Sequence, residues 1–276
     1  MKQIKRILAL LLVCVLALSL CACGKTVGSY RVLKTLGSES FRIGYRQGDY
    51  VAVYIDAALK TLAADGTVHA LAIKWLGADE VTMEADSAAL EALGTIPQRE
   101  LIVGVSDSSC PMSYADGSGY AGFDVELAQA VCQKLGWTVR YQPIPADSAY
   151  VELSSGNVDC VWGGMVLDRV NYDENGKEKP EKERIALSEP YLTNELILVT
   201  RADSKGSSVS RLKGATVMLD TDARYMTALQ ADESLLNRFG QVERVTGGAQ
   251  QCFDSLNAGE CSAIVTDSVA LAYYTH

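Results

Sequence analysis

From residue 100 onward, short apolar runs alternate with longer stretches in which apolar side chains recur at helical spacing. The stretch at 123–136 predicts a helix that ends at Gly136. After the polar break at 202–208 the alternation starts again. The apolar runs predict strands at 101–105, 137–144, 158–164, 195–200, 215–219, 242–245 and 262–267. This alternation indicates parallel sheets covered by helices, and its two runs indicate two lobes.

A helix pair is also predicted ahead of this region. Ile55, Leu59 and Leu62 recur at helical spacing up to Gly66, which suits the left-handed position that ends a helix. Thr67 is then predicted to cap a second amphipathic helix. By itself this pattern indicates only two helices packed on a core.

The first residues carry an export signal. A basic start precedes an apolar run from Ile7 to Leu20, and small residues precede Cys23. The run is too short to span a membrane comfortably. The sequence "LCAC" at 20–23 resembles the bacterial lipobox, which implies that residues 1–22 are a lipoprotein signal peptide, that Cys23 carries the lipid and that 23–29 form a tether. A soluble protein cut nearby and an uncleaved anchor are the alternatives.

Charge and cysteine content limit the possible functions. The chain has 276 residues, and loss of Lys2, Lys5 and Arg6 with the signal lowers its net charge from −9 to −12, which disfavours nucleic acid as a partner. Eight cysteines are present, but the signal would remove two and the lipid would occupy a third. The odd remainder, without a C-x-x-C pair, argues against a disulfide framework and a zinc site. A bridge between Cys252 and Cys261 remains a minority alternative to buried thiols.

Several motifs together resemble one family. They are "LIVGVSDSSCPMSYADGSGYAGFDVELAQAVCQKLG", "LSSGNVDCVWGGM", "LSEPYL", "LKGATVML", "CFDSLNAGECSAIVTDSVALAYY" and "FRIGYRQGD...ALKTLAADGTVHALAIKWLG". As a set they are similar to the solute-binding proteins of polar amino-acid ABC importers, bacterial extracellular solute-binding protein family 3, over nearly all of the mature chain. The resemblance implies an α/β fold of two lobes with parallel sheets joined by two hinge strands, of the type II periplasmic-binding-protein-like class.

The order of the elements departs from that family. In that family, a pattern similar to residues 30–77 ends the chain and follows a segment similar to "DSVALAYY". Here the pattern stands near the start of the chain, which implies a circular permutation. The expected division is then 30–40 as the last strand of lobe 2 and hinge approach, 41–77 and 100–195 as lobe 1, 78–99 as a new linker with a helix at 87–93, and 196–276 as the rest of lobe 2. A domain-swapped dimer and a piece of a longer tandem protein are the alternatives. The segments 195–200 and 41–46 are nominated as hinges.

The resemblance also implies a ligand site in a cleft between the lobes. Asp267 is expected to face the ammonium of an amino acid, although an aspartate there would also cap the following helix. The backbone of Gly163, Gly164 and Met165 is expected close to the ligand. Arg169 is expected to pair with the ligand carboxylate. Arg184 is its rival, because an extra charged loop separates the two arginines.

Other positions differ from the family and define a roomier pocket. Ser109, Met112 and Ala146 stand where the family often has aromatic residues, so Met112, Tyr114 and Trp162 are expected to line the pocket with Ser109. Tyr114 and Trp162 are equally explained as core residues. The segment "DTDARY" at 220–225 replaces a hydroxyl-rich loop. There, Thr221 and Arg224 are candidate ligand contacts, with helix capping and an exposed position as their alternatives.

The expected function is capture of an amino acid or similar small polar solute and its delivery to the membrane subunits of an ABC importer. The expected location is the outer face of the cell membrane, by lipid anchor, in a Gram-positive-type bacterium. Sensing without transport is an alternative. A dehydratase-like enzyme is a weaker one, since the two histidines, His69 and His276, form no apparent catalytic pair. No cofactor or metal is expected.

Overall fold

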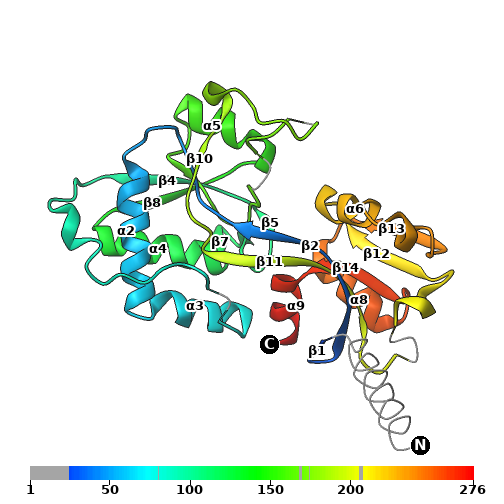
Figure 1. Cartoon of the computed structure of the whole chain (residues 1–276). Helices are drawn as coiled ribbons and strands as arrows, with labels where there is room; N and C mark the ends of the chain where they lie inside the picture. The colour runs from blue at the N-terminus through cyan, green and yellow to red at the C-terminus, as the bar shows by residue number, and fades with distance from the viewer. Residues whose placement is uncertain (1–24, 80, 168–169, 174, 205–207) are drawn as a thin grey trace, which may run out of the picture. The chain divides into compact units, whose positions relative to one another are not determined.

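The computed structural model describes residues 25–79, 81–167, 170–173, 175–204 and 208–276 (Figure 1). This part of the chain forms two compact units. The larger comprises Gly37–Leu196 and Asp267–His276. The smaller comprises the described residues up to Leu36 together with Ile197–Thr266. The chain therefore passes between the units at 36/37, 196/197 and 266/267.

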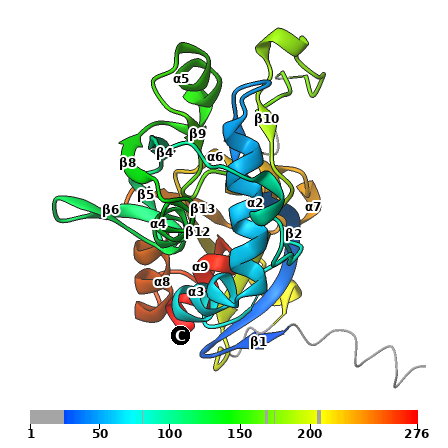
Figure 2. The same ribbon diagram turned by 90° about the vertical axis from the view of Figure 1, so that its left-hand side faces the viewer.

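The larger unit is built on a mixed sheet of order β10-β3-β9-β4-β8. Strand β4 pairs in parallel with β8 and β9, whereas β3 pairs antiparallel with β9 and β10. The strands are β3 (Gly44–Tyr45), β4 (Glu100–Val105), β8 (Thr138–Pro143), β9 (Cys160–Val161) and β10 (Ala186–Leu187). A second small sheet consists of β5 (Ser108–Ser109), β6 (Ser113–Asp116) and β7 (Gly119–Ala121), and its β6–β7 hairpin extends away from the main sheet (Figure 2).

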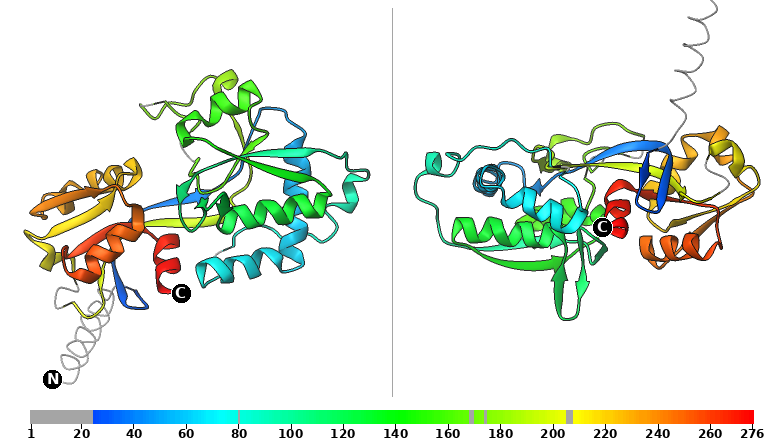
Figure 3. Two further views of the ribbon diagram at one scale, coloured as in Figure 1. Left: turned by 180° about the vertical axis from the view of Figure 1, so that it is seen from behind. Right: turned by 90° about the horizontal axis from the view of Figure 1, so that it is seen from below.

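Helices cover both faces of this sheet, and strand β4 shows why. Leu101, Val103 and Val105 pack in the main core together with α2 (Val51–Ala64), α3 (Thr67–Leu76) and α4 (Phe123–Leu135). Ile102 points to the other face, where it packs on a second cluster that includes residues of α5 (Ala149–Ser155). Helices α2, α3 and α4 contact one another, with α3 and α4 side by side and α2 running across them (Figure 3).

Glycines end the helices where the residue pattern predicts. Gly66 and Gly136 both adopt the left-handed conformation, at φ 83° and 71°. The predicted capping role of Thr67 is wrong. Thr67 is the first residue of α3 and Gly66 is its N-cap; the Asp65 carboxylate accepts the Thr67 N–H at 3.1 Å and the Thr67 hydroxyl at 2.6 Å.

The predicted linker at 78–99 has little regular structure. In place of the helix expected at 87–93, there is one 3-10 turn, η2 (Glu91–Leu93), with no buried residue to anchor a longer helix. The segment is nevertheless tied to the core. Thr82 N donates to the Tyr191 carbonyl at 3.1 Å, and Trp137 Nε1 donates to the Pro97 carbonyl at 2.7 Å.

The smaller unit contains most of a six-stranded sheet of order β1-β2-β11-β14-β12-β13. Strand β12 is parallel to β13 and β14. The strands are β1 (Thr26–Val27), β2 (Tyr30–Phe41), β11 (Leu192–Arg201), β12 (Thr216–Asp220), β13 (Gln241–Val245) and β14 (Ala263–Asp267), and the helices are α6 (Ala223–Gln230), α7 (Glu233–Leu236) and α8 (Gly248–Ala258). Short 3-10 turns occur in both units, at η3 (Ala146–Ser148), η4 (Glu181–Glu183) and η5 (Val209–Leu212). Strand β2 thus lies in the same sheet as β12 and β14.

The unit boundaries differ from the expected lobes in two places. Helix α9 (Ser268–Thr275) belongs to the larger unit, where it contacts α3 and Tyr273 stacks on Trp75 at 6.5 Å between ring centres. Of the two nominated hinges, 195–200 includes the passage at 196/197. The passage at 36/37 lies within β2, ahead of the nominated 41–46.

The five cysteines among the described residues are free thiols, four of them buried. The structure therefore has no bridge between Cys252 and Cys261, and burial raises the pKa of these thiols to about 12 and about 11. The signal peptide, Cys23 and Gly24 lie outside the described residues, whereas the rest of the expected tether is described and contains β1, which pairs with β2. In the part of the chain that is described, no helix has the length and apolar content to cross a membrane.

Candidate functional site

The Gly163–Gly164 turn follows β9, beside the end of the parallel strand β4. Both glycines have left-handed backbones, with φ of 75° and 81°. A Cβ on Gly163 would lie 2.7 Å from Val105 Cγ1, and one on Gly164 would lie 2.5 Å from Ser109 Cβ. The turn therefore needs glycine for its conformation and for space. It also ends β9 after Val161, so the strand expected at 158–164 is shorter than predicted.

A buried carboxylate holds this turn. Asp124, in the first turn of α4, accepts the Gly164 N–H at Oδ2 over 2.7 Å and the Tyr191 hydroxyl at Oδ1 over 2.8 Å. The side chain is buried, at 1% exposure. Burial raises the pKa of Asp124 to about 7, while the hydrogen bonds from Gly164 and Tyr191 oppose that rise.

Hydroxyl groups line the other side of the turn. The Ser109 hydroxyl donates to Ser106 Oγ at 2.7 Å, and the Ser113 hydroxyl donates to the Ser106 carbonyl at 2.5 Å. The Ser106 N–H donates to the Gly163 carbonyl at 3.0 Å. The turn therefore lies between the carboxylate of Asp124 and a group of serines.

The predicted pocket residues of the larger unit differ in burial. Met112, Trp162 and Met165 are almost fully buried, at 2%, 1% and 3% exposure, so they support the turn from the core. Trp162 packs edge-on against Tyr191. Tyr114 is partly exposed, and it lies edge-on to Trp75 rather than against Trp162. Of the two interpretations of Trp162, the structure supports a core residue.

Asp267 ends β14 and caps α9. Its carboxylate accepts the Ala270 N–H at 2.8 Å, and the residue is buried at 8% exposure. The capping interpretation is therefore confirmed. A role toward an ammonium group stays a prediction.

In the smaller unit, Thr221 and Arg224 stand together at the start of α6. Thr221 is exposed, and its carbonyl accepts from Arg244. Arg224 Nε donates to Asp222 Oδ2 at 2.8 Å, and Asp222 also accepts the Arg224 N–H at 2.9 Å as the helix cap. The Asp222 carboxylate therefore already pairs with Arg224, the side chain that the sequence proposed as a ligand contact.

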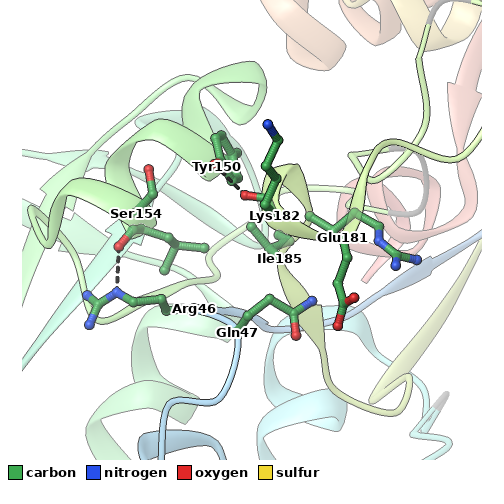
Figure 4. A pocket seen from close by; sticks show the side chains of 9 residues that line it. Arg46, Gln47, Tyr150, Ser154, Glu181, Lys182 and Ile185 are labelled. Carbon is green, nitrogen blue, oxygen red and sulfur yellow. Dashed lines mark hydrogen bonds between the residues drawn. The ribbon is translucent and has the colours of Figure 1, made fainter.

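The structure describes only one of the two arginines that compete for the carboxylate role. Arg169 lies outside the described residues. Arg184 pairs with Glu178 and lines a hollow of about 330 Å³ beside α5. Arg46 and Tyr150 stand at this hollow, where they donate to the carbonyls of Leu153 and Lys182 at 2.8 and 2.7 Å (Figure 4). No contact to the Gly163–Gly164 turn is recorded for Arg184 among the described residues.

The residues that the sequence did not reveal are Asp124 and Tyr191. The only local signal was an acidic residue directly after Gly122-Phe123, at a helix start, where acidic residues are common. Its partner Gly164 is 40 positions away and Tyr191 is 67 positions away. Among the described residues, no group of three or more His, Cys, Asp or Glu side chains is arranged to hold a metal ion.

Comparison with known proteins places the chain in a family. The family model of the bacterial extracellular solute-binding proteins, family 3, matches residues 101–259, more than half of the chain. The chain belongs to this family. The matched segment contains β4, α4, the Gly163–Gly164 turn and the start of α6. The family resemblance read from the sequence motifs is thus confirmed.

Individual relatives match parts of the chain. The arginine-binding extracellular protein ArtP of Bacillus subtilis is 34% identical over 121 residues, which cover 44% of this chain and 43% of the relative. The L-cystine-binding protein TcyA of the same organism is 25% identical over 177 residues, covering 63% and 59%. A probable amino-acid ABC transporter-binding protein of Haemophilus influenzae is 24% identical, covering 64% and 63%. The chain therefore spans roughly half of the length of these relatives, all named as binding proteins and not as enzymes.

A solved structure shows the same kind of fold. An ancestral cationic amino acid solute-binding protein aligns with a TM-score of 0.52 and 26% identity, covering 63% of this chain and 72% of that one. The expected α/β class of the amino-acid-binding proteins is thus confirmed. The alignment leaves more than a third of this chain unmatched.

Proposed function

We propose that this protein is the solute-binding component of an ABC uptake system and that it binds an amino acid at the Gly163–Gly164 turn. The supporting observation is the family match over a segment in which this turn follows a strand parallel to β4. In α/β sheets, ligands bind beyond the carboxyl ends of parallel strands. The protein then acts by binding and release and catalyses no reaction.

The proposed ligand class follows from the relatives and from the site. Relatives of this chain are named for arginine, cystine and histidine, and the aligned ancestral protein is named for cationic amino acids. A free amino acid presents a carboxylate, for which backbone N–H groups and an arginine are suitable partners. We therefore place L-arginine, L-histidine and L-cystine first among the candidates.

A thermal-shift screen tests this proposal. A ligand that binds only the folded protein at a hundredfold excess over its Kd raises the free energy of unfolding by about 2.7 kcal/mol. We expect one L-amino acid to raise the melting temperature by several degrees and its D-enantiomer to have little effect. If none of the twenty amino acids, cystine or short peptides raises the melting temperature, the amino-acid assignment fails.

Arg169 is proposed as the partner of the ligand carboxylate. A charge-assisted hydrogen bond contributes about 1.5–3 kcal/mol, so Arg169→Ala is expected to weaken binding at least tenfold. Arg184→Ala is the matched control, because Arg184 pairs with Glu178 and lines the hollow beside α5. A loss of affinity in Arg184→Ala with none in Arg169→Ala would transfer the role to Arg184.

We also propose that the order of the elements is circularly permuted relative to the family. Two observations support this proposal. Strand β2, near the start of the chain, lies in the sheet of β12 and β14, and β3 pairs with β9 in the other sheet. The family model begins only at residue 101 and leaves both strands unmatched.

A rearranged gene tests the permutation. A chain in which residues 100–276 are followed by residues 30–77 restores the family's order. It should fold, melt within a few degrees of the natural chain and bind the same ligand as a monomer. Failure to fold would argue against a permuted relationship. Dimers of the natural chain that dissociate only on unfolding would favour exchange of strands between copies.

The proposed location is the outer face of the membrane, with lipid on Cys23 and the importer's membrane subunits as partners. Metabolic labelling with radioactive palmitate in a bacterial host is expected to mark the natural chain and not the Cys23→Ser variant. Equal labelling of both chains would contradict the anchor. A shift of all the protein into the medium in Cys23→Ser would strengthen the assignment.

A further inference from the structure

Asp124 is a buried carboxylate whose described partners are all uncharged. Oδ2 accepts the Gly164 N–H and Oδ1 accepts the Tyr191 hydroxyl, and the Trp162 side chain and the Gly163 N–H add weaker hydrogen-bonding interactions. Its own N–H donates to the Met112 carbonyl at 2.9 Å, which fixes the start of α4. Burying a carboxylate without a cation costs free energy, so a residue of this kind needs a structural or functional reason.

The turn that it contacts has little freedom on its other side. Gly164 lies against Ser109 and Met112, whose Cβ atoms would be 2.5 and 3.3 Å from an added Cβ. The Gly163 carbonyl is held by Ser106. The hydrogen bond from Gly164 to Asp124 therefore fixes which way the peptide between the two glycines faces.

We propose that Asp124 is the positioning residue of the Gly163–Gly164 turn and that the charge of its carboxylate sets the orientation of the turn's N–H groups. The proposal rests on the proposed function only in identifying this turn as a ligand contact. The carboxylate has acceptors for both donors when ionised. When protonated, it carries a donor of its own, and at least one of its contacts must weaken.

The electrostatic setting places this change near neutral pH. Burial raises the pKa of Asp124 to about 7. Tyr191 is the titratable side chain hydrogen-bonded to Asp124 in the described part of the chain, and burial raises its pKa well above 10, so it stays a neutral donor. Glu126, in the same turn of α4, is partly exposed and pairs with Lys74 on α3. Asp124 is therefore the group in this cluster that changes charge near pH 7.

The first test is direct observation of the turn by NMR. In the natural chain labelled with ¹⁵N-glycine, the Gly164 amide resonance is expected to titrate between pH 5.5 and 8.5 with a midpoint near 7. The titration should be absent in Asp124→Asn and shifted in Tyr191→Phe. A Gly164 resonance that does not titrate in the natural chain would overturn the proposal, whether or not any ligand binds.

The second test measures binding with L-arginine as the probe, or whichever amino acid the thermal screen identifies. Asp124→Asn replaces one acceptor with an NH₂ group that faces a donor, so we expect at least tenfold weaker binding. Tyr191→Phe leaves the bond to Gly164 intact and is expected to weaken binding less. Equal affinity of Asp124→Asn and the natural chain would overturn the proposal.

A control variant separates positioning from general loss of stability. Asp159 accepts the Ile102 N–H at 2.7 Å and pairs with Arg99, in the same unit but without contact to the turn. Asp159→Asn should lower the melting temperature yet leave the Gly164 titration and the affinity unchanged. If it reduces the affinity as much as Asp124→Asn does, the role of Asp124 is merely structural. If Asp124→Asn does not fold, the Gly164 titration in the natural chain and in Tyr191→Phe decides whether the proposal holds.

If the natural chain binds none of the probes while Gly164 titrates as expected, the proposed function fails and the positioning role stands. If a probe binds but Gly164 does not titrate, the proposed function stands and the positioning role fails. The two proposals are thus tested separately.

Discussion

The Gly163–Gly164 turn and the start of α6 both offer backbone N–H groups, but the protein holds them in opposite ways. At the turn, the carboxylate comes from α4, 40 positions away in sequence. At α6, the carboxylates are local, since Asp220 accepts the Asp222 N–H at 2.6 Å and Asp222 accepts the Arg224 N–H at 2.9 Å. The N–H of the turn thus finds its acceptor through tertiary packing, whereas the N–H groups at the start of α6 find theirs in neighbouring residues of the sequence.

This difference separates the two candidate regions. The local aspartates at α6 satisfy N–H groups and place negative charge where an anion would bind. At the turn, a distant carboxylate accepts the Gly164 N–H and also interacts with the Gly163 N–H, so tertiary packing fixes the direction of the turn. Variants in each region test this contrast.

The largest effect is expected in the pH dependence of stability. The pKa of Asp124 rises from 3.8 to about 7 on folding, so the folded state holds the proton more tightly. Its ionisation therefore costs stability as the pH rises from about 4 to about 7, by about 4 kcal/mol when fully developed, since one pKa unit corresponds to 1.36 kcal/mol. Urea unfolding of the natural chain and of Asp124→Asn should give curves that diverge over this range. Parallel curves would contradict the buried, raised-pKa state.

The next largest effect on the free energy of unfolding is expected for Gly164→Ala. The added methyl group meets Ser109 and the backbone has φ 81°, so we expect about 3 kcal/mol of destabilisation from overpacking and left-handed strain together. Gly176→Ala is the matched control. It has φ 74° with open space around the added methyl, and it should cost only about 1–2 kcal/mol. Equal losses in urea unfolding would show that the turn is not tightly packed.

The capping of α6 should contribute less. Asp222→Ala removes the cap and is expected to cost about 1 kcal/mol in the free energy of unfolding, whereas Asp222→Asn retains a capping oxygen and should cost much less. If the two variants are equally destabilised, the charge of Asp222 matters more than the cap, and the contrast with the turn weakens.

The smallest effect is expected from Arg224→Ala. Its partner Asp222 is two positions away and partly exposed, so the ion pair should contribute about 0.5 kcal/mol or less. Calorimetry with the amino acid found in the screen gives the second readout. A tenfold loss of affinity in this variant would restore Arg224 as a ligand contact.

The sequence predicted the elements better than it predicted the site. Helix ends at Gly66 and Gly136 were visible because a left-handed residue after an amphipathic stretch is a local signal. The N-cap of α3 was missed because it is Gly66, which has no side-chain capping group, while Asp65 and Thr67 beside it both carry one. The short strand β9 was overestimated because the apolar pattern continues through Trp162, while the two glycines end the extended backbone.

The contacts of the site could not be inferred from spacing. Nothing in the sequence joins Asp124 to Gly164 or to Tyr191, because packing of α4 on the sheet brings them together. The glycines themselves were found through family resemblance. Their need for glycine follows from the neighbours Val105 and Ser109, which come from a different part of the chain.

The central claim is that the Gly163–Gly164 turn binds an amino acid. Titration of the ¹⁵N-glycine-labelled chain with L-arginine, L-histidine and L-cystine tests it most directly. We predict that one of these ligands moves the Gly163 and Gly164 amide resonances in a saturable way while Gly176 stays in place. Binding that leaves both turn resonances unmoved, or no binding by any amino acid, would contradict the claim.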